Sequence, residues 1–278
     1  MEKITNPKDY HPSIKFLSVF LIGILICFFL PDMISGTSDV VINIAELEGL
    51  GGIGATFSAR NDKIVEIILM GPVVAVLYYM LMRYMIGKID KTQGKNKYFL
   101  YAIEIELGLL ISLNVASHFV HLMFDQVSAA YRTLHGGYSL NEPLLYIYWA
   151  DEWLGHTIIH VTYFSWFVLA LVTEFLISET RRVNLDEFCF LIPLGVGIGV
   201  LDGYAAIRSE AGFLLMILHI ILLGIQVVLI ASKKINPLKY PVFMALFISS
   251  LFVIGYNIYW IFEEGIRAYY PFWSSNLS

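Results

Sequence analysis

The sequence has few charged residues and few cysteines. Asp, Glu, Lys and Arg make up only 15% of its 278 residues, whereas 58% are hydrophobic, which is unlike an ordinary soluble domain. No run of basic residues is interleaved with aromatic ones, so nucleic-acid binding has no support. The two cysteines, Cys27 and Cys189, both fall in apolar segments, where we expect small buried side chains rather than a disulfide.

Seven apolar runs are long enough to cross a bilayer, which takes about 20 helical residues. They cover residues 14–34, 64–86, 98–124, 148–177, 188–207, 212–232 and 241–262. The connections between them leave no room for a sizeable soluble core. We therefore predict an all-α integral membrane protein in which residues 1–278 form a single bundle of about seven transmembrane helices.

The positive charges predict the orientation of this bundle, because cytoplasmic loops carry an excess of Lys and Arg. With a cytoplasmic N-terminus and an outside C-terminus, only five of the 18 Lys and Arg residues fall in outside segments, namely Arg60, Lys63, Arg132, Arg208 and Arg267. We expect this orientation, and a location in the plasma membrane. The first run has a mixed-charge lead-in and no small-residue cleavage pattern, so we interpret it as a retained span rather than a signal peptide.

Two other patterns concern packing. The long outside connections, 35–63 and 125–147, contain aromatic, glycine and apolar residues, and we expect short interfacial helices or caps over the bundle there. Gly195, Gly199 and Gly203 recur every four residues in the fifth run, a spacing that lets helices approach closely. We expect this glycine stripe to pack against a neighbouring span.

Histidines and carboxylates gather near the predicted outer ends of the spans. Asn114, His118, His121 and Asp125 share one helical face because they are four, three and four residues apart. Ionisable groups in hydrocarbon are costly and normally face the bundle interior. We therefore predict one shared pocket, lined by His118, His121, Asp125, Glu152, His156, His160, Asp202 and His219, with supporting roles for Asn114, Asp151, Tyr204 and Asn257.

Such a residue set favours a bound divalent transition metal. Imidazole suits zinc, iron and copper, and carboxylates add hard oxygen ligands. We expect zinc first, with iron or copper as alternatives. The predicted ligands are His118, His121, His156, His160, Asp202 and His219.

A metal-bound water has a pKa of about 7 and can attack a lipid ester, amide or phosphate. We therefore predict a metal-dependent hydrolase acting on a lipid or small molecule from the outer face. Asp125 or Glu152 would be the general base or a further ligand, and Tyr204 or His219 would hold the developing oxyanion. The same ligands also fit a copper or iron oxygenase.

Seven helices with a His-and-Asp site in the membrane resemble the alkaline ceramidase and progestin/adiponectin-receptor group in architecture. That group carries a His-three-His pair on its last span, whereas His156 and His160 lie on the fourth predicted span here. The resemblance therefore implies architecture only and assigns no residue.

Three other functions are compatible with the sequence. A proton- or ion-coupled transporter would use the same histidines as protonation sites and would need a route to the inside, for which Glu104 and Glu106 are the candidates. A haem protein would ligate iron through two histidines and would be coloured. An accessory membrane subunit would use the polar pocket only to receive a metal or a partner.

Overall fold

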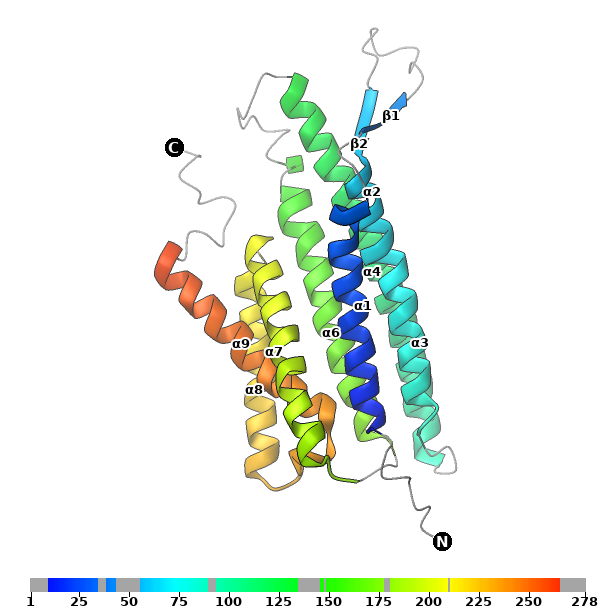
Figure 1. Cartoon of the computed structure of the whole chain (residues 1–278), viewed down its shortest axis with the longest axis vertical. Helices are drawn as coiled ribbons and strands as arrows, with labels where there is room; N and C mark the ends of the chain where they lie inside the picture. The colour runs from blue at the N-terminus through cyan, green and yellow to red at the C-terminus, as the bar shows by residue number, and fades with distance from the viewer. Residues whose placement is uncertain are drawn as a thin grey trace.

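The computed structural model describes residues 10–34, 39–43, 56–89, 94–134, 146–147, 149–177, 181–209 and 211–265. Seven helices within these ranges are long and apolar enough to cross a membrane, which confirms the predicted number of helices of spanning length and composition. They form an elongated bundle in which α1 (Pro12–Ile34) begins at one end and the strands β1 and β2 lie at the other (Figure 1). We call these the basal end and the hairpin end.

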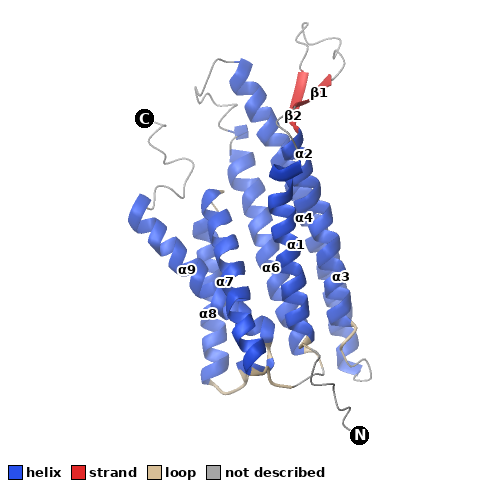
Figure 2. Cartoon of the chain, in the orientation of Figure 1, coloured by secondary structure: helices blue, strands red, loops and turns tan. Residues whose placement is uncertain are grey.

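The helices follow the predicted runs closely, and two spans contain a π-helix (Figure 2). The second span consists of α2 (Asn61–Ile68), the π-helix η1 (Leu69–Val73) and α3 (Val74–Ile86). The fourth consists of the π-helix η2 (Trp149–Gly155) and α6 (His156–Phe175). The others are α4 (Gly94–Leu134), α7 (Leu185–Arg208), α8 (Gly212–Ala231) and α9 (Pro241–Glu264), the last preceded by the short 3-10 helix η3 (Pro237–Lys239).

The structure corrects the prediction in the two long connections. β1 (Asp39–Asn43) and β2 (Thr56–Arg60) pair as antiparallel strands, with Asp39 opposite Arg60, where we expected short helices or caps. In the other connection α4 continues to Leu134 instead of ending near residue 124. Its 41 residues extend about 60 Å at 1.5 Å per residue, roughly twice the hydrocarbon thickness, so α4 projects beyond a bilayer.

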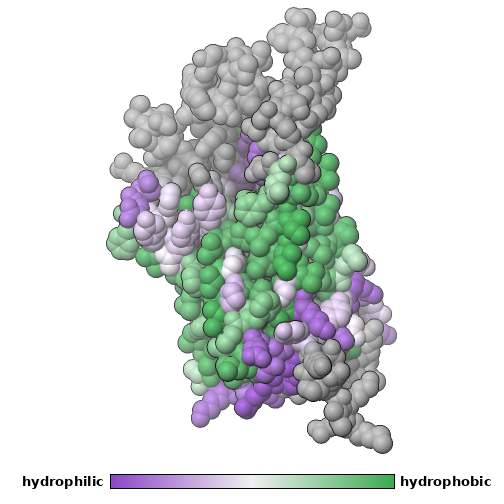
Figure 3. Space-filling model, in the orientation of Figure 1, coloured by the Kyte–Doolittle hydropathy of each residue, from purple (hydrophilic) through white to green (hydrophobic). Residues whose placement is uncertain are grey.

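The surface and the core both suit a membrane protein. Figure 3 shows a broad belt of hydrophobic residues across the bundle, with hydrophilic residues gathered at the basal end. Inside, the rings of Tyr78 and Trp166 stack with their centroids 4.4 Å apart. The Tyr78 hydroxyl donates to the Trp166 carbonyl oxygen over 2.6 Å, because a buried hydroxyl needs an acceptor within the protein.

The predicted packing of the glycine stripe is confirmed, and its partner is α9. A Cβ atom added at Gly195 would lie 2.8 Å from the carbonyl oxygen of Ala245, and one at Gly199 would lie 2.7 Å from that of Ser249. Both neighbours are backbone atoms, so α7 and α9 would have to separate to accept a side chain. The stripe therefore fixes the position of α7 relative to α9. Asp202 lies near the C-terminal end of α7.

Replacing Gly199 with alanine should destabilise the protein by about 1–3 kcal/mol, the usual cost of overpacking a tight contact. Thermal unfolding in detergent would measure the loss. Gly224→Ala on α8 is the matched control, because an added Cβ there meets no atom within 4 Å and alanine favours a helix over glycine. Equal unfolding temperatures for the two variants would refute the packing role of Gly199.

Glu187, at the basal end, ties the start of α1 to the start of α7. Its buried carboxylate accepts hydrogen bonds from both terminal nitrogens of Arg181 and from the backbone N–H groups of Asn184 and His11. The His11 ring is also buried, and burial, with the nearby Arg181 charge, lowers the pKa of His11 to about 4 against the opposing effect of Glu187. These hydrogen bonds to one carboxylate hold the start of α1 against the start of α7.

A second buried acid, Glu174 in α6, caps α9. Its two carboxylate oxygens accept hydrogen bonds from the backbone N–H groups of Val242 and Phe243, over 2.9 and 3.1 Å. The first N–H groups of a helix have no partner within it, and negative charge is favoured at that end. Glu174 therefore has a structural role, which is to accept the first hydrogen bonds at the start of α9.

Candidate functional site

A cavity of about 610 Å³ opens near the hairpin end between α1, α2, α4, α6 and α7. The structure brings seven of the nine predicted site residues to its wall: His118, His121, Asp125, His156, His160, Asp202 and Tyr204. These side chains come from three helices that are far apart in sequence. The predicted convergence of histidines and carboxylates therefore has a physical counterpart in one cavity.

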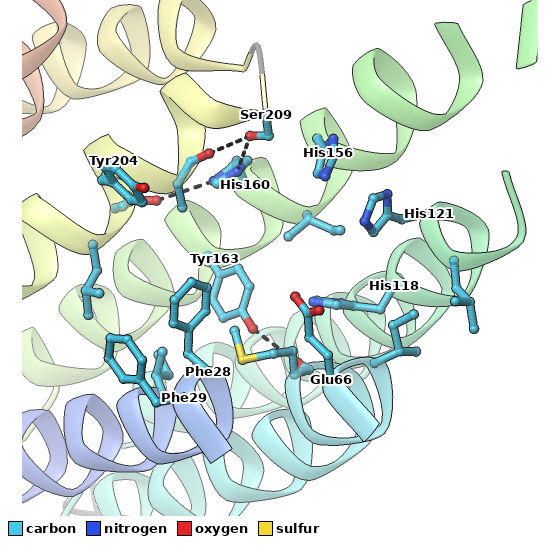
Figure 4. Close-up of a pocket in the computed structure, with 18 of the residues that line it drawn as sticks. Phe28, Phe29, Glu66, His118, His121, His156, His160, Tyr163, Tyr204 and Ser209 are labelled. Carbon is cyan, nitrogen blue, oxygen red and sulfur yellow. Dashed lines mark hydrogen bonds and ion pairs between the residues drawn. The ribbon is translucent and has the colours of Figure 1, made fainter. Parts of the chain in front are cut away.

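The opposite wall of the cavity is apolar. Residues of α1 and α7 form it, including Leu21, Phe28, Phe29, Ile198 and Leu201. In Figure 4 the two phenylalanines lie on the α1 side, across the cavity from His156, His121 and Ser209. A cavity with one polar wall and one apolar wall suits an amphiphilic ligand better than a fully polar one.

The hydrogen bond of His118 determines its tautomer. Its Nδ1 lies 2.8 Å from the carbonyl oxygen of Asn114, one turn earlier in α4. A carbonyl oxygen can only accept, so Nδ1 carries the proton and Nε2 of the neutral ring carries a lone pair. Metal-ligating histidines usually show this arrangement, in which the second nitrogen donates to a carbonyl or carboxylate.

His121 has the same tautomer for a different reason. Its Nδ1 lies 2.5 Å from a carboxylate oxygen of Asp151, whose side chain is only 4% exposed. The carboxylate accepts the Nδ1 proton, so Nε2 of a neutral His121 also carries a lone pair. The His156 ring lies beside it, with the two ring centroids 4.2 Å apart. Asp151, predicted as a supporting residue, is thus placed to orient one histidine.

Both π-helices pack against α4 at these histidines. A Cβ atom added at Gly71 in η1 would lie 3.3 Å from Cβ of His118, and one at Gly155 in η2 would lie 3.4 Å from Cα of His121. Pro72 in η1 lacks an N–H group and so disturbs the regular helical hydrogen bonds. Single π-helical turns recur at functional sites in proteins, and here two of them flank one pair of histidines.

The other two predicted site residues are His219, which does not line the cavity, and Glu152. His219 lies in a separate buried network, with one ring nitrogen 2.9 Å from Ser250 Oγ and the other 3.4 Å from Asp202. The side chain of Glu152 lies outside the described part of the structure. Among the described His, Cys, Asp and Glu side chains, no group of three is arranged to hold a metal ion as it stands. Metal binding would require side-chain rotation.

Two residues of the cavity wall were missed by the sequence analysis. Glu66 in α2 pairs with Lys63 over 2.7 Å, and in Figure 4 its carboxylate points toward the ring of His118. Ser209 follows α7 directly, and its Oγ lies 2.8 Å from Nε2 of His160. Glu66 was visible as an acid just inside an apolar run, whereas a lone serine after Arg208 gives no signal.

Glu104 and Glu106, the acids that a transport route would need, do not line the cavity. Glu104 forms an ion pair with Arg83 over 2.6 Å, and both side chains are nearly half exposed. Glu106 is also exposed on the side of α4. Neither acid lines the cavity, so the structure gives no support for a path through them.

No protein-family model, curated protein or solved structure matches this chain. The fold and the cavity describe a protein with, in the described ranges, seven helices of membrane-spanning length and a cavity near one end that has a polar and an apolar wall.

Proposed function

We propose that the protein is a membrane-embedded metalloenzyme, a hydrolase whose metal is held by His118, His121 and His156. The observation that carries the proposal is the tautomer shared by His118 and His121, each of which has its Nδ1 bonded to an acceptor. Neutral imidazoles with an Nε2 lone pair are the form that a metal binds. His156 is included because its ring lies beside that of His121.

Zinc suits this donor set best. Three protein ligands with an open position are the usual arrangement of catalytic zinc, and Asp125 and Glu66 on the same cavity wall could add an oxygen ligand. Iron and copper accept the same imidazoles, and with either of them the site would favour an oxygenase. Because the described side chains do not hold an ion as they stand, the proposal requires the His156 side chain to rotate while the Nδ1 bonds of His118 and His121 stay in place.

The depth of the site supports an amphiphilic substrate. The third span begins at Lys97, and about 20 residues of helix, or about 30 Å, cross the hydrocarbon. Counted from Lys97, this length ends near residue 117, within a candidate span that runs to Asp125, so we infer that His118 and His121 lie near the level where lipid head groups meet acyl chains. A substrate bound there would place its polar group against the histidines and its apolar part against the α1 and α7 wall.

A metal at this position would polarise the scissile group and lower the pKa of a bound water to about 7. Asp125 lines the cavity next to the histidines and is the candidate general base. Tyr204 lines it from α7 and is the candidate donor to a developing oxyanion. The cytoplasmic N-terminus belongs to the same proposal and rests on the distribution of Lys and Arg; a location in the plasma membrane is proposed with it.

Metal analysis of detergent-purified protein tests the proposal. We expect about one zinc, iron or copper ion per chain in the wild type and its loss in the His118→Ala and His156→Ala variants. A visible spectrum would separate a haem from a simple metal ion. His219→Gln is the matched control, because both ring nitrogens of His219 already contact other side chains. Metal-free, colourless wild type would overturn the proposal, and metal loss in His219→Gln would overturn this ligand assignment.

A further inference from the structure

A chain of polar side chains joins α6, α7, α8 and α9 beside the cavity. Ser209 Oγ lies 2.8 Å from Nε2 of His160, and Nδ1 of the same ring lies 3.6 Å from Oδ1 of Asp202. The other carboxylate oxygen of Asp202 lies 3.4 Å from Nε2 of His219, whose Nδ1 lies 2.9 Å from Ser250 Oγ. We call these five residues the serine–histidine chain.

The carboxylate at its centre favours one tautomer of His160. Asp202 can only accept, and although the 3.6 Å to Nδ1 of His160 exceeds hydrogen-bond length, its negative charge favours a proton on that nitrogen. Nε2 of His160 is then the acceptor that faces Ser209. Serine hydroxyl, imidazole Nε2, imidazole Nδ1 and carboxylate follow in the order of a Ser-His-Asp triad, in which the histidine is a base for the serine.

A competing hydrogen bond gives Ser209 an ordinary structural alternative. Its Oγ also lies 2.8 Å from the carbonyl oxygen of Ala205, four residues earlier, a bond that helical serines commonly make. The hydroxyl has one proton, which can point to the carbonyl oxygen of Ala205, to that of Ala206 at 3.2 Å, or to His160. Rotation of this hydroxyl alone would move the proton from the structural bond to the base.

Only the Ser209 end of the chain faces the cavity. Ser209, His160 and Asp202 line it, whereas His219 and Ser250 do not. Along α7 the cavity wall continues from Ser209 back to Ile198, about 16 Å at 1.5 Å per residue. An acyl chain could follow this wall along its apolar residues Ala205, Leu201 and Ile198 while its carbonyl carbon lies at Ser209. The geometry thus favours a carboxylic ester with a long acyl chain.

We propose that Ser209 is a nucleophile for acyl transfer from such an ester. Ser209 Oγ bonds to the acyl carbon and its proton passes to Nε2 of His160. The ester C–O bond then breaks, and the leaving alcohol takes that proton. Water hydrolyses the acyl-serine in the second step and gives the fatty acid and the free hydroxyl. The inference deepens the proposed hydrolase and rests on it for the amphiphilic substrate, but here Ser209, and not a metal-bound water, attacks the acyl carbon.

A long-chain alkyl fluorophosphonate tests this inference, because such a probe bonds to an activated serine with loss of fluoride. We expect labelling of the purified wild-type protein at Ser209, identified by peptide mass spectrometry. Ser209→Ala should not label, and His160→Gln should label at least about 100-fold more slowly, the usual contribution of a positioned base. Ser112 is the internal control, since its Oγ bonds the Gly108 carbonyl without a histidine and should stay unlabelled.

The result is separable from that of the metal experiment. Labelling at Ser209 in metal-free protein would support the nucleophile and reject the metal centre. Full metal content with no label on folded wild-type protein would overturn the nucleophile and leave the metal centre standing. Equal labelling of Ser112 and Ser209 would also overturn it, because reactivity would then not depend on His160.

Discussion

A Glu187→Gln variant is expected to lose about 2–3 kcal/mol of unfolding free energy, because the carboxylate is buried while its Arg181 partner is 28% exposed, which lowers the cost of about 3–5 kcal/mol for breaking a fully buried ion pair. The Glu187 side chain is only 1% exposed and lies 2.6 Å from a terminal nitrogen of Arg181. Glutamine would present an amide N–H₂ group to donors that now share two carboxylate oxygens. The guanidinium would lose its charged partner, and the link between α1 and α7 through the His11 N–H group would weaken. Titration with SDS in mixed micelles would measure the change.

Glu104→Gln is the matched control for this effect. Glu104 also lies 2.6 Å from an arginine nitrogen, on Arg83, but the two side chains are 45% and 49% exposed. Exposed ion pairs contribute about 0–1 kcal/mol, so this variant should unfold almost like the wild type. The two pairs have the same distance and differ in burial. Equal losses of unfolding free energy in the two variants would mean that the strength of these ion pairs does not depend on their burial.

The number and limits of the spans were predictable because a bilayer requires long apolar helices. The overrun of α4 was not, since its last turns are polar and resemble a loop when only hydropathy is considered. The hairpin was missed for another reason: β1 is only five residues long. Its Val40, Val41 and Ile42 favour a strand, but they were interpreted as part of an interfacial segment.

The part of the candidate site that consists of histidines was predictable from the sequence. His118, His121, His156 and His160 all line one cavity, as their helical spacing and shared depth had indicated. The hydrogen-bond partner of each ring could not be predicted from the residue spacing, because it depends on how the neighbouring helices are rotated about their axes. His160 follows His156 by one turn, yet its Nε2 meets Ser209 on α7.

Helix packing also explains why the polar groups divide into two sets. Close approach of the π-helices to α4 keeps His118 and His121 near η1 and η2. The glycine stripe sets α7 against α9, and Asp202 there lies within reach of both His160 and His219. The one predicted pocket thus divides into the residues of the proposed metal centre and those of a separate serine–histidine chain. The sequence indicated the shared depth of these residues but not this division.

Asp151→Asn is expected to weaken metal binding by about 10–100-fold, the usual effect of replacing a group that supports a metal ligand. Asparagine keeps an oxygen that can accept the Nδ1 proton of His121, so the tautomer is retained. The negative charge is lost, and with it the added basicity of the ring nitrogen that would face the metal. Competition against a chromophoric zinc chelator, starting from metal-free protein, would give the dissociation constant. Asp186→Asn, an exposed aspartate at the basal end, should leave it unchanged.

A double-mutant cycle would show whether this effect passes through His121. If Asp151 acts by orienting that ring, adding Asp151→Asn to a His121→Ala variant should change the zinc affinity little further, because the coupled residues fail together. Additive losses would mean that Asp151 influences the metal through space or through another contact. Unchanged affinity in Asp151→Asn alone would remove His121 from the ligand set, since a carboxylate 2.5 Å from its ring could not then be tuning a metal-bound imidazole.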